Sequence, residues 1–338
     1  MSNRLNAKKL YIVNTFIYVG KGVFLFKPTS MRLIYFVFLC SLLVGFSACE
    51  KSTAANCPAD CANNNLQHVQ RVLLIGIDGC RPDALQKANT PNMDKLRTDG
   101  RYSWSVDRGN HYTNSGAGWS TMFTGVWHNK HGVTDNTFQG QNYGQYPHFL
   151  CRIKDNNTCF KTASIVKYGQ LNDHIAKPCN TDVLLDYVEP RKVREATLNH
   201  LRACDLDVVF VHLDEVDHAG HANGFHPDVP QYISAIESTD ALIGEFVEAV
   251  YERENNNNED WLIIVSSDHG GKIDGTHDNH DNDTEVTRVF SIFRTKNTAN
   301  KGEMPYNPAL VDIVPTIFDH LSIPVDNSWN LDGVKVDL

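Results

Sequence analysis

Short, continuous runs of apolar residues alternate along the chain with segments in which apolar residues recur at helical spacing. The runs have the length and composition of strands that are buried on both faces of a sheet. They lie at 71–77, 161–167, 207–213 and 261–266. Helices are predicted at 90–99, at 198–204, at 230–254 and, near the C-terminus, at 310–318.

This alternation predicts an α/β fold in which a mostly parallel central sheet is flanked by helices on both faces. At 338 residues, the chain is long enough to bury a sizeable core. We place that domain at 70–338, because the residues before it have a different pattern.

The N-terminal part of the chain has the pattern of a targeting signal. Residues 31–48 have a positive residue, an apolar run and then small residues, as in a secretory signal. The segment 46–49 resembles a bacterial lipobox, which predicts cleavage before Cys49 and anchoring of the lipidated protein in the bacterial cell envelope, periplasmic or surface-exposed. The alternative is a transmembrane helix, for which the run is short. Residues 1–30 are interpreted as a mis-assigned upstream segment and 49–69 as a polar tether.

Charge and cysteine content narrow the function classes. The net charge of -9, with no extended basic block beyond the N-terminus, argues against nucleic acid as a bulk partner. In an oxidising compartment some of the nine cysteines should pair. Cys151 with Cys159 and Cys57 with Cys61 are plausible local pairs, although sequence does not fix the connectivity.

Acids and histidines directly follow three of the apolar runs. Asp78 follows the first, Asp217 and His221 the third, and Asp268 and His269 the last. Because the carboxyl ends of parallel strands meet at one edge of a sheet, these side chains should converge. Nitrogen and oxygen ligands in this number suit zinc or a related divalent ion.

A hydroxyl group completes this candidate site. Ser115 lies among small residues just ahead of an apolar, helix-like segment, so it is either the N-cap of a helix or a nucleophile near a helix N-terminus. A sixth ligand is expected from His277 or His280 in the acid-rich loop that follows. Together these groups are enough for two metal ions, which would activate the Ser115 hydroxyl for attack on a phosphoryl group.

These residues resemble the alkaline phosphatase superfamily, and most closely its type I phosphodiesterase/nucleotide pyrophosphatase branch, over about residues 70 to 338. The likeness rests on an Ile-Asp-Gly at Asp78, a nucleophile nine residues before Thr124-Gly125, Asp217-x-x-x-His221, Ser267-Asp268-His269-Gly270, and the closing segments 311–316 and 331–333.

The resemblance implies a three-layer alkaline-phosphatase-like fold and two zinc ions. One ion would be held by Asp217, His221 and a late histidine, either His277 or His280. The other would be held by Asp78, Ser115, Asp268 and His269. Spacing from His269 favours His277 as the late histidine, whereas the register to Glu285 and Arg288 favours His280, which we prefer slightly.

The chain departs from the diesterase pattern at its nucleophile. That branch usually has Thr followed by Pro-Asn, whereas here Ser115 is followed by Gly116-Ala117-Gly118. The missing Asn removes a donor to phosphate, and Lys167, which resembles in position a sulfate-binding Lys of sulfatases, is a candidate replacement. The alternative for Lys167 is a solvated strand-end charge. Asn114 is a second candidate substrate contact.

We therefore expect a hydrolase of small phosphate-ester substrates, of phosphodiesterase/nucleotide pyrophosphatase type, that acts through a Ser115 phospho-enzyme and two zinc ions. Phosphomonoesterase activity is the first alternative, because monoesterase alkaline phosphatases use Ser. A sulfatase is disfavoured, because the Arg that sulfatases carry four residues after the nucleophile is replaced by Trp119. The remaining alternative is an inactive, lipid-anchored binding protein.

Overall fold

The computed structural model describes residues 69–109, 111–177 and 179–338. The expected upstream segment, signal peptide, lipidated Cys49 and nearly all of the tether, with Cys57 and Cys61, lie outside these residues. Within the described ranges, no helix combines the length and the apolar character needed to cross a membrane.

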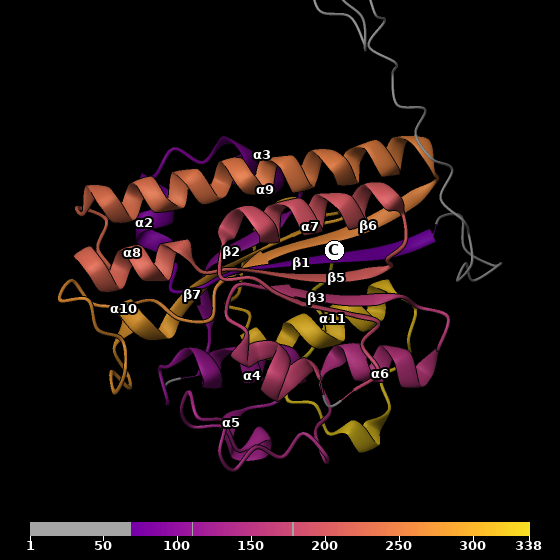
Figure 1. Ribbon diagram of the computed structural model, residues 1–338, viewed down its shortest axis with the longest axis horizontal. Coiled ribbons are helices and arrows are strands. Elements are labelled where there is room, and N and C mark those ends of the chain that lie inside the picture. Colours follow the sequence, from indigo (N-terminus) through magenta and orange to yellow (C-terminus); the bar gives the residue numbers. More distant parts are fainter. Residues whose placement is uncertain (1–68, 110, 178) are drawn as a thin grey trace, which may run out of the picture. The chain divides into compact units, whose positions relative to one another are not determined.

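One eight-stranded sheet forms the centre of the domain, with the strand order β4-β3-β5-β1-β6-β7-β2-β8 (Figure 1). β7 is antiparallel to both of its neighbours, and every other pairing is parallel. The mostly parallel sheet is thus confirmed. The strands are β1 (Val69–Ile77), β2 (Arg101–Asp107), β3 (Thr162–Val166), β4 (Val183–Asp186), β5 (Val208–Leu213), β6 (Glu259–Ser266), β7 (Arg288–Arg294) and β8 (Gly302–Glu303).

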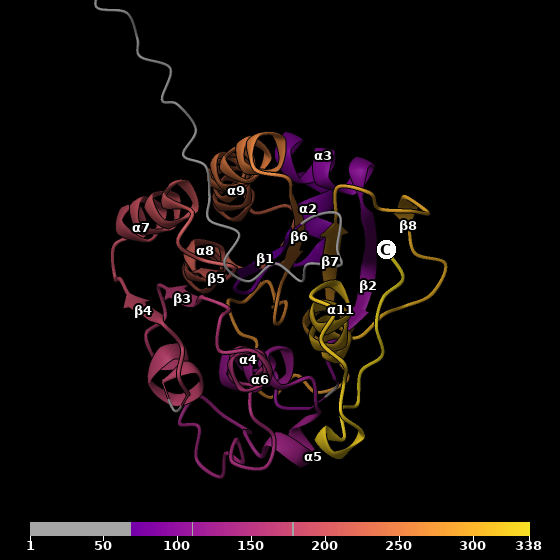
Figure 2. The same ribbon diagram turned by 90° about the vertical axis from the view of Figure 1, so that its right-hand side faces the viewer.

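Helices cover both faces of this sheet and complete the three layers (Figures 1 and 2). The first face carries α2 (Pro82–Lys87), α3 (Pro91–Asp99), α7 (Pro190–Ala203), α8 (Glu215–Asn223) and α9 (Pro230–Asn256). The second carries α4 (Ser115–Thr124), α5 (His128–His131), α6 (Phe149–Asn156) and α11 (Ile313–His320). The short α10 (Thr284–Thr287) precedes β7, a π-helical turn spans Asn172–Ala176, and 3-10 turns span Leu310–Asp312 and Asn327–Trp329.

The apolar strand runs feed two cores because successive side chains of a strand point to opposite faces. From β1, Leu73 and Ile75 join the cluster under α7 and α9, whereas Val72 and Leu74 join the cluster under α4 and α11. All four are fully buried. Each buried aliphatic side chain of this size contributes about 1.5–3 kcal/mol to folding stability. Burial therefore holds the central strands in place, and the polar residues that follow them emerge at the edge where these strands end.

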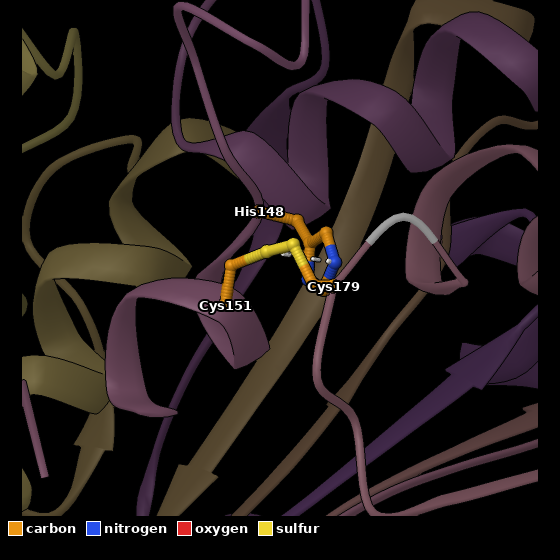
Figure 3. Close-up of side chains that lie close together, drawn as sticks. All are labelled: His148, Cys151 and Cys179. Atoms are coloured by element: carbon orange, nitrogen blue, oxygen red, sulfur yellow. Dashed lines mark hydrogen bonds between the residues drawn. A yellow bond between two sulfur atoms is a disulfide. The ribbon is translucent and has the colours of Figure 1, made fainter. Parts of the chain in front are cut away.

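A disulfide links Cys151 of α6 to Cys179, whose Cα atoms are 5.4 Å apart. The expected Cys151–Cys159 pair is therefore wrong, because the fold brings Cys179 to Cys151 from 28 residues away, at a normal spacing for a disulfide. His148 lies against this pair (Figure 3), with Nε2 3.5 Å from the Cys151 sulfur. Both thiols are used in the disulfide, so this group offers no thiolate ligand to a metal.

Candidate active site

The three strands that precede the predicted ligands are neighbours in the sheet, in the order β5-β1-β6. Ile77 pairs with Leu213, and Gly76 pairs with Ser266. The chain therefore leaves all three strands at one edge, which confirms the predicted convergence. Asp217 and His221 do not lie in the loop directly after their strand. They lie one turn apart on α8, where residues four apart share a face.

Asp78 is the buried centre of the site. Its Oδ2 accepts hydrogen bonds from Trp119 Nε1 at 3.0 Å and His212 Nε2 at 2.9 Å. Its Oδ1 lies 3.2 Å from His269 Nε2 and 3.5 Å from Ser115 Oγ. Burial alone would raise the pKa of this carboxyl, but the hydrogen bonds and charges of the two histidines outweigh it and hold the pKa well below its usual value. Asp78 is thus an ionised, oriented carboxylate.

Ser115 is the first residue of α4, and Asn114 is its N-cap. The side-chain oxygen Oδ1 of Asn114 accepts from Ala117 N at 3.1 Å, and the side-chain Nδ2 donates to Thr134 O at 2.8 Å. The alternative in which Ser115 caps the helix is therefore wrong. Instead, Ser115 Oγ lies 3.1 Å from His269 Nε2. Asn114, a candidate substrate contact, uses both polar atoms of its side chain within the protein.

Asp217, His221 and His277 form the first candidate metal group, with ligand atoms within 4.8 Å of one another. His221 Nδ1 donates to Gly275 O at 2.8 Å, and His277 Nδ1 donates to Thr113 O at 2.9 Å. These two contacts leave Nε2 of each ring available as a metal ligand. The two Nε2 atoms face each other at 3.1 Å. At this separation both atoms are placed to bind one shared cation.

Asp78 and His269 lie beside Ser115 and, with Asp268 next to His269, form the second group. His269 Nδ1 donates to the carbonyl of Gly270 at 2.7 Å, which leaves Nε2 directed at Ser115, Asp78 and, at 3.5 Å, Asp268 Oδ2. Asp217 also belongs beside this group, since its carboxylate lies within 4.8 Å of the Asp78 and His269 ligand atoms. The two groups are therefore adjacent.

Two buried carboxylate oxygens in this arrangement show that it fits a cation. Asp217 Oδ1 and Asp268 Oδ2 have no hydrogen-bond partner among the described residues. Burial first, and then repulsion from Asp78, raise the pKa of Asp217 to about 9 and that of Asp268 to about 7. Unpaired buried carboxylates are costly unless a positive charge neutralises them. The donor set, of carboxylate oxygens and imidazole nitrogens, suits a divalent ion such as zinc.

The structure places the two late histidines, His277 and His280, in different surroundings. His277, not the preferred His280, lies beside Asp217 and His221, with Nε2 4.0 Å from Asp217 Oδ1. His280 Nε2 instead lies 3.0 Å from Thr276 Oγ1, away from the group. The cause is a tight turn at Gly275, whose φ of +84° favours glycine and directs the chain back so that His277 enters the site.

Lys167 follows β3, and its ammonium group is paired with acids at the start of α8. Its Nζ lies 3.0 Å from Glu215 Oε1 and 3.8 Å from Asp214 Oδ2. The side chain is mostly buried, so the alternative of a fully solvated charge is wrong. Contact with a substrate remains a prediction.

Three residues next to the candidate site were not predicted to have the contacts that the structure shows. His212 lies inside an apolar strand run, where a buried polar residue is itself a signal. Trp119 is fully buried and donates to Asp78, and Gly76 leaves room for its ring, because a Cβ there would lie 2.2 Å from it. Asn136 Oδ1 accepts from Gly116 N at 2.7 Å, which brings a side-chain amide to the N-terminus of α4.

Comparison with known proteins decides the family. A model of the metalloenzyme superfamily matches residues 76–325. The chain belongs to this superfamily. Membership implies a divalent metal, in agreement with the two ligand groups. The chain is also similar to an uncharacterized pyrophosphatase/phosphodiesterase of Schizosaccharomyces pombe, with 25% identity over 226 residues. That match spans 59% of this metalloenzyme and 44% of the yeast protein, so less than half of the relative is covered.

Solved structures share the alkaline-phosphatase-like fold of this metalloenzyme. An inactive form of murine ectonucleotide pyrophosphatase/phosphodiesterase 5 in complex with AMP matches with a TM-score of 0.58 and 16% identity, over 78% of this chain and 99% of that one. A protein in complex with its substrate D-glucosamine-2-N,6-O-disulfate matches with a TM-score of 0.62 and 14% identity, over 79% of each chain. At these identities the likeness establishes the fold alone.

Proposed function

We propose that this metalloenzyme hydrolyses phosphoric esters, of the phosphodiesterase/nucleotide pyrophosphatase type, with Ser115 as the nucleophile and two zinc ions as cofactors. The observation that carries the proposal is the position of the Ser115 hydroxyl. It lies at the N-terminus of a ten-residue helix, 3.1 Å from His269 Nε2 and 3.5 Å from Asp78 Oδ1, beside two adjacent ligand groups.

The proposed ligands divide between the two groups. Asp217, His221 and His277 would hold one ion, and the Asp78, Asp268, His269 and Ser115 set would hold the other. When bound, the ions lower the pKa of the Ser115 hydroxyl and neutralise charge on the reacting phosphoryl oxygens.

The side chains of this protein supply the nucleophile and its orientation. The Ser115 oxygen forms a bond to phosphorus, the bond from phosphorus to the leaving oxygen breaks, and the proton lost by Ser115 is balanced by the proton that the leaving oxygen gains. Water then hydrolyses the phosphoserine ester and restores the hydroxyl. Trp119 and His212 hold Asp78 through Oδ2, so that Oδ1 keeps facing Ser115.

The transferred group would lie at the N-terminus of α4. The partial positive charge of a helix N-terminus favours an anion there. Asn136 accepts from Gly116 N through Oδ1, which places its side chain at the same helix end. We propose that Asn136 takes the role of the phosphate donor missing after the nucleophile. Lys167 stays a proposed second contact, although its ion pair with Glu215 would have to open.

Diester or pyrophosphate substrates are favoured over monoesters. The yeast relative is named a pyrophosphatase/phosphodiesterase, and the murine structure holds AMP. The Ser nucleophile supports monoester hydrolysis as the second candidate. A paired assay decides between them. We expect zinc-loaded protein to hydrolyse an aryl phosphodiester faster than an aryl phosphate, and chelation to abolish both activities. Turnover of an aryl sulfate alone, or a metal-free protein without any turnover, would overturn the proposal.

We also propose that the protein is held in the bacterial cell envelope by a lipid on Cys49. The support is the signal-like segment 31–48 and the lipobox-like residues before this cysteine. Cells that express the full chain should incorporate labelled fatty acid into it, and Cys49→Ala should remove the label. A label that persists in Cys49→Ala refutes the anchor.

A further inference from the structure

An imidazole ring and two sulfur atoms meet at the start of α6. His148 Nε2 lies 3.5 Å from the Cys151 sulfur, and Cys151 is disulfide-bonded to Cys179 (Figure 3). One ligand atom from each of the three side chains lies within 4.8 Å of the other two. Two cysteines and a histidine are a donor set that zinc favours, but a sulfur binds a metal as the thiolate. Reduction of the disulfide would therefore turn this group into a set of three metal ligands.

The start of α6 prepares two of these groups as ligands. His148 is the N-cap of the helix, and Cys151 is its third residue. The N-terminus of this eight-residue helix favours the negative charge of a Cys151 thiolate. Burial lowers the pKa of His148 to about 3, so the ring is neutral and keeps a lone pair for a metal ion.

The third ligand, Cys179, comes from a segment 28 residues further along the chain, and its Cα lies 5.4 Å from that of Cys151. Two thiolates on one tetrahedral zinc ion have their sulfurs about 3.8 Å apart, against about 2.0 Å in a disulfide. Each sulfur has to move by only about 1 Å, which small rotations of the side chains provide. The backbone that forms the disulfide is therefore also suited to hold an ion between the two sulfurs.

A cavity of about 380 Å³ borders all three side chains. It has room for an ion and for a water molecule as the fourth ligand of a tetrahedral site. Asp155 lines the cavity with a negative charge. Lys154 lines it too, but its Nζ donates to Asp182 Oδ2 at 2.9 Å and to Phe160 O at 2.9 Å, so its charge is compensated. The charges around the cavity are thus compatible with a cation.

This group is separate from the candidate active site. The His148 ring lies 6.0 Å from the ring of Phe123, near the end of α4, whereas Ser115 begins that helix. Eight residues of α-helix span about 12 Å. The two groups share no residue, and the candidate active site offers only oxygen and nitrogen ligands.

We propose that His148, Cys151 and Cys179 form a second metal site, which binds zinc or a related divalent ion when the disulfide is reduced. The reductant is a dithiol, which reaches the half-buried Cys179, gives two electrons and two protons to the disulfide and becomes a disulfide itself. Binding of the ion then releases the two thiol protons and none from the neutral His148. This site goes beyond the proposed function and does not depend on it.

Cobalt(II) is the probe for this site. Thiolate ligands give cobalt(II) an intense charge-transfer absorption in the near ultraviolet, which oxygen and nitrogen ligands do not, so this signal is absent from the candidate active site. Cobalt(II) is titrated into the full chain in its oxidised form and after reduction by a phosphine, which is converted to the phosphine oxide. Cys159 and Cys204, which are also disulfide-bonded, are kept in every variant, as are the remaining cysteines.

Two variants and one matched control assign the ligands. Cys179→Ser removes one sulfur. His148→Asn removes the imidazole, keeps the disulfide and places a favourable residue at the N-cap. His174→Ala is the control, because His174 lies on the same segment as Cys179 but stacks on the ring of Phe138.

We expect one cobalt ion per chain with thiolate absorption in reduced wild type and in reduced His174→Ala, and none in the oxidised proteins. Cys179→Ser should lose the absorption, and His148→Asn should bind this ion at least about 100-fold more weakly, since loss of a partner that only orients a ligand already costs about 10–100-fold. Reduced wild type without the absorption, or variants that match wild type, would overturn the site. If Cys179→Ser does not fold, His148→Asn still decides, because it keeps the disulfide of the oxidised fold.

Discussion

Replacement of His277 and of His280 by Ala separates a metal ligand from a histidine that only lies nearby. His277 is 4% exposed, and its Nε2 lies 3.1 Å from His221 Nε2 and 4.0 Å from Asp217 Oδ1. His280 contacts the hydroxyl of Thr276 instead. The two substitutions remove the same chemical group from the same loop, so His280→Ala is a matched control.

The expected magnitude follows from the loss of a direct ligand. Loss of a partner that only orients a ligand weakens metal binding by about 10–100-fold, so His277→Ala should weaken one zinc site by at least about 100-fold. At a free zinc concentration 100 times the wild-type Kd, that site stabilises the fold by about 2.7 kcal/mol in wild type and about 0.4 kcal/mol in the variant. For a domain of this size the difference lowers the zinc-dependent rise in Tm by about 5 °C.

Equilibrium dialysis and thermal unfolding, each with and without zinc, measure these quantities. We expect His277→Ala to bind one tight ion per chain where wild type binds two, and to lose most of the zinc-dependent stabilisation. His280→Ala should resemble wild type in both measurements. The opposite result, with the tight ion lost in His280→Ala and kept in His277→Ala, would refute the assignment of the first group.

Three further outcomes are expected. Burial opposes ionisation of Glu259, but Arg253 and a second arginine outweigh burial and lower the pKa of Glu259. The stabilisation of the fold by this carboxylate is therefore present above the unfolded-state pKa of about 4.3. It is lost as pH falls through the lower folded-state pKa. Glu259→Gln should therefore lower the free energy of unfolding in urea by about 3–5 kcal/mol at pH 7. If the free energies of unfolding of the variant and wild type do not approach each other below about pH 4, the reasoning is contradicted. Gly76→Ala should lower both stability, by about 1–3 kcal/mol, and turnover, because its methyl group would displace the Trp119 ring that holds Asp78. Asn136→Ala should lower kcat/KM by about 100-fold with zinc content unchanged, and an unaltered rate would exclude Asn136 as a phosphoryl donor.

The apolar runs were sufficient to predict the strands that build the site. Those before Asp78, Asp217 and Asp268 are central and parallel, and a strand buried on both faces leaves a continuous apolar signal in the sequence. The strand at 288–294 has an apolar run interrupted by Ser291, and the strand at 302–303 has only two residues, so neither was predicted; their pairing depends on the partners that the fold supplies.

The details of the site depended on tertiary contacts. The choice of His277 over His280 follows from a turn at Gly275 and from a hydrogen bond to Thr113, a residue far away in the sequence. Asn114 takes the helix cap and frees Ser115, although either residue type caps helices well. In both cases sequence spacing allowed two arrangements with similar local energies, and only long-range packing distinguishes them.

Zinc content and diester turnover, measured on the same sample of Ser115→Ala, test the central claim most directly. Ala removes one hydroxyl from the second group and leaves Asp78, Asp268 and His269 in place. The account predicts that the variant keeps most of its zinc and unfolds at nearly the wild-type temperature, while hydrolysis of the phosphodiester disappears and no phosphoryl adduct is found on quenched protein. Wild-type turnover by zinc-loaded Ser115→Ala would contradict it.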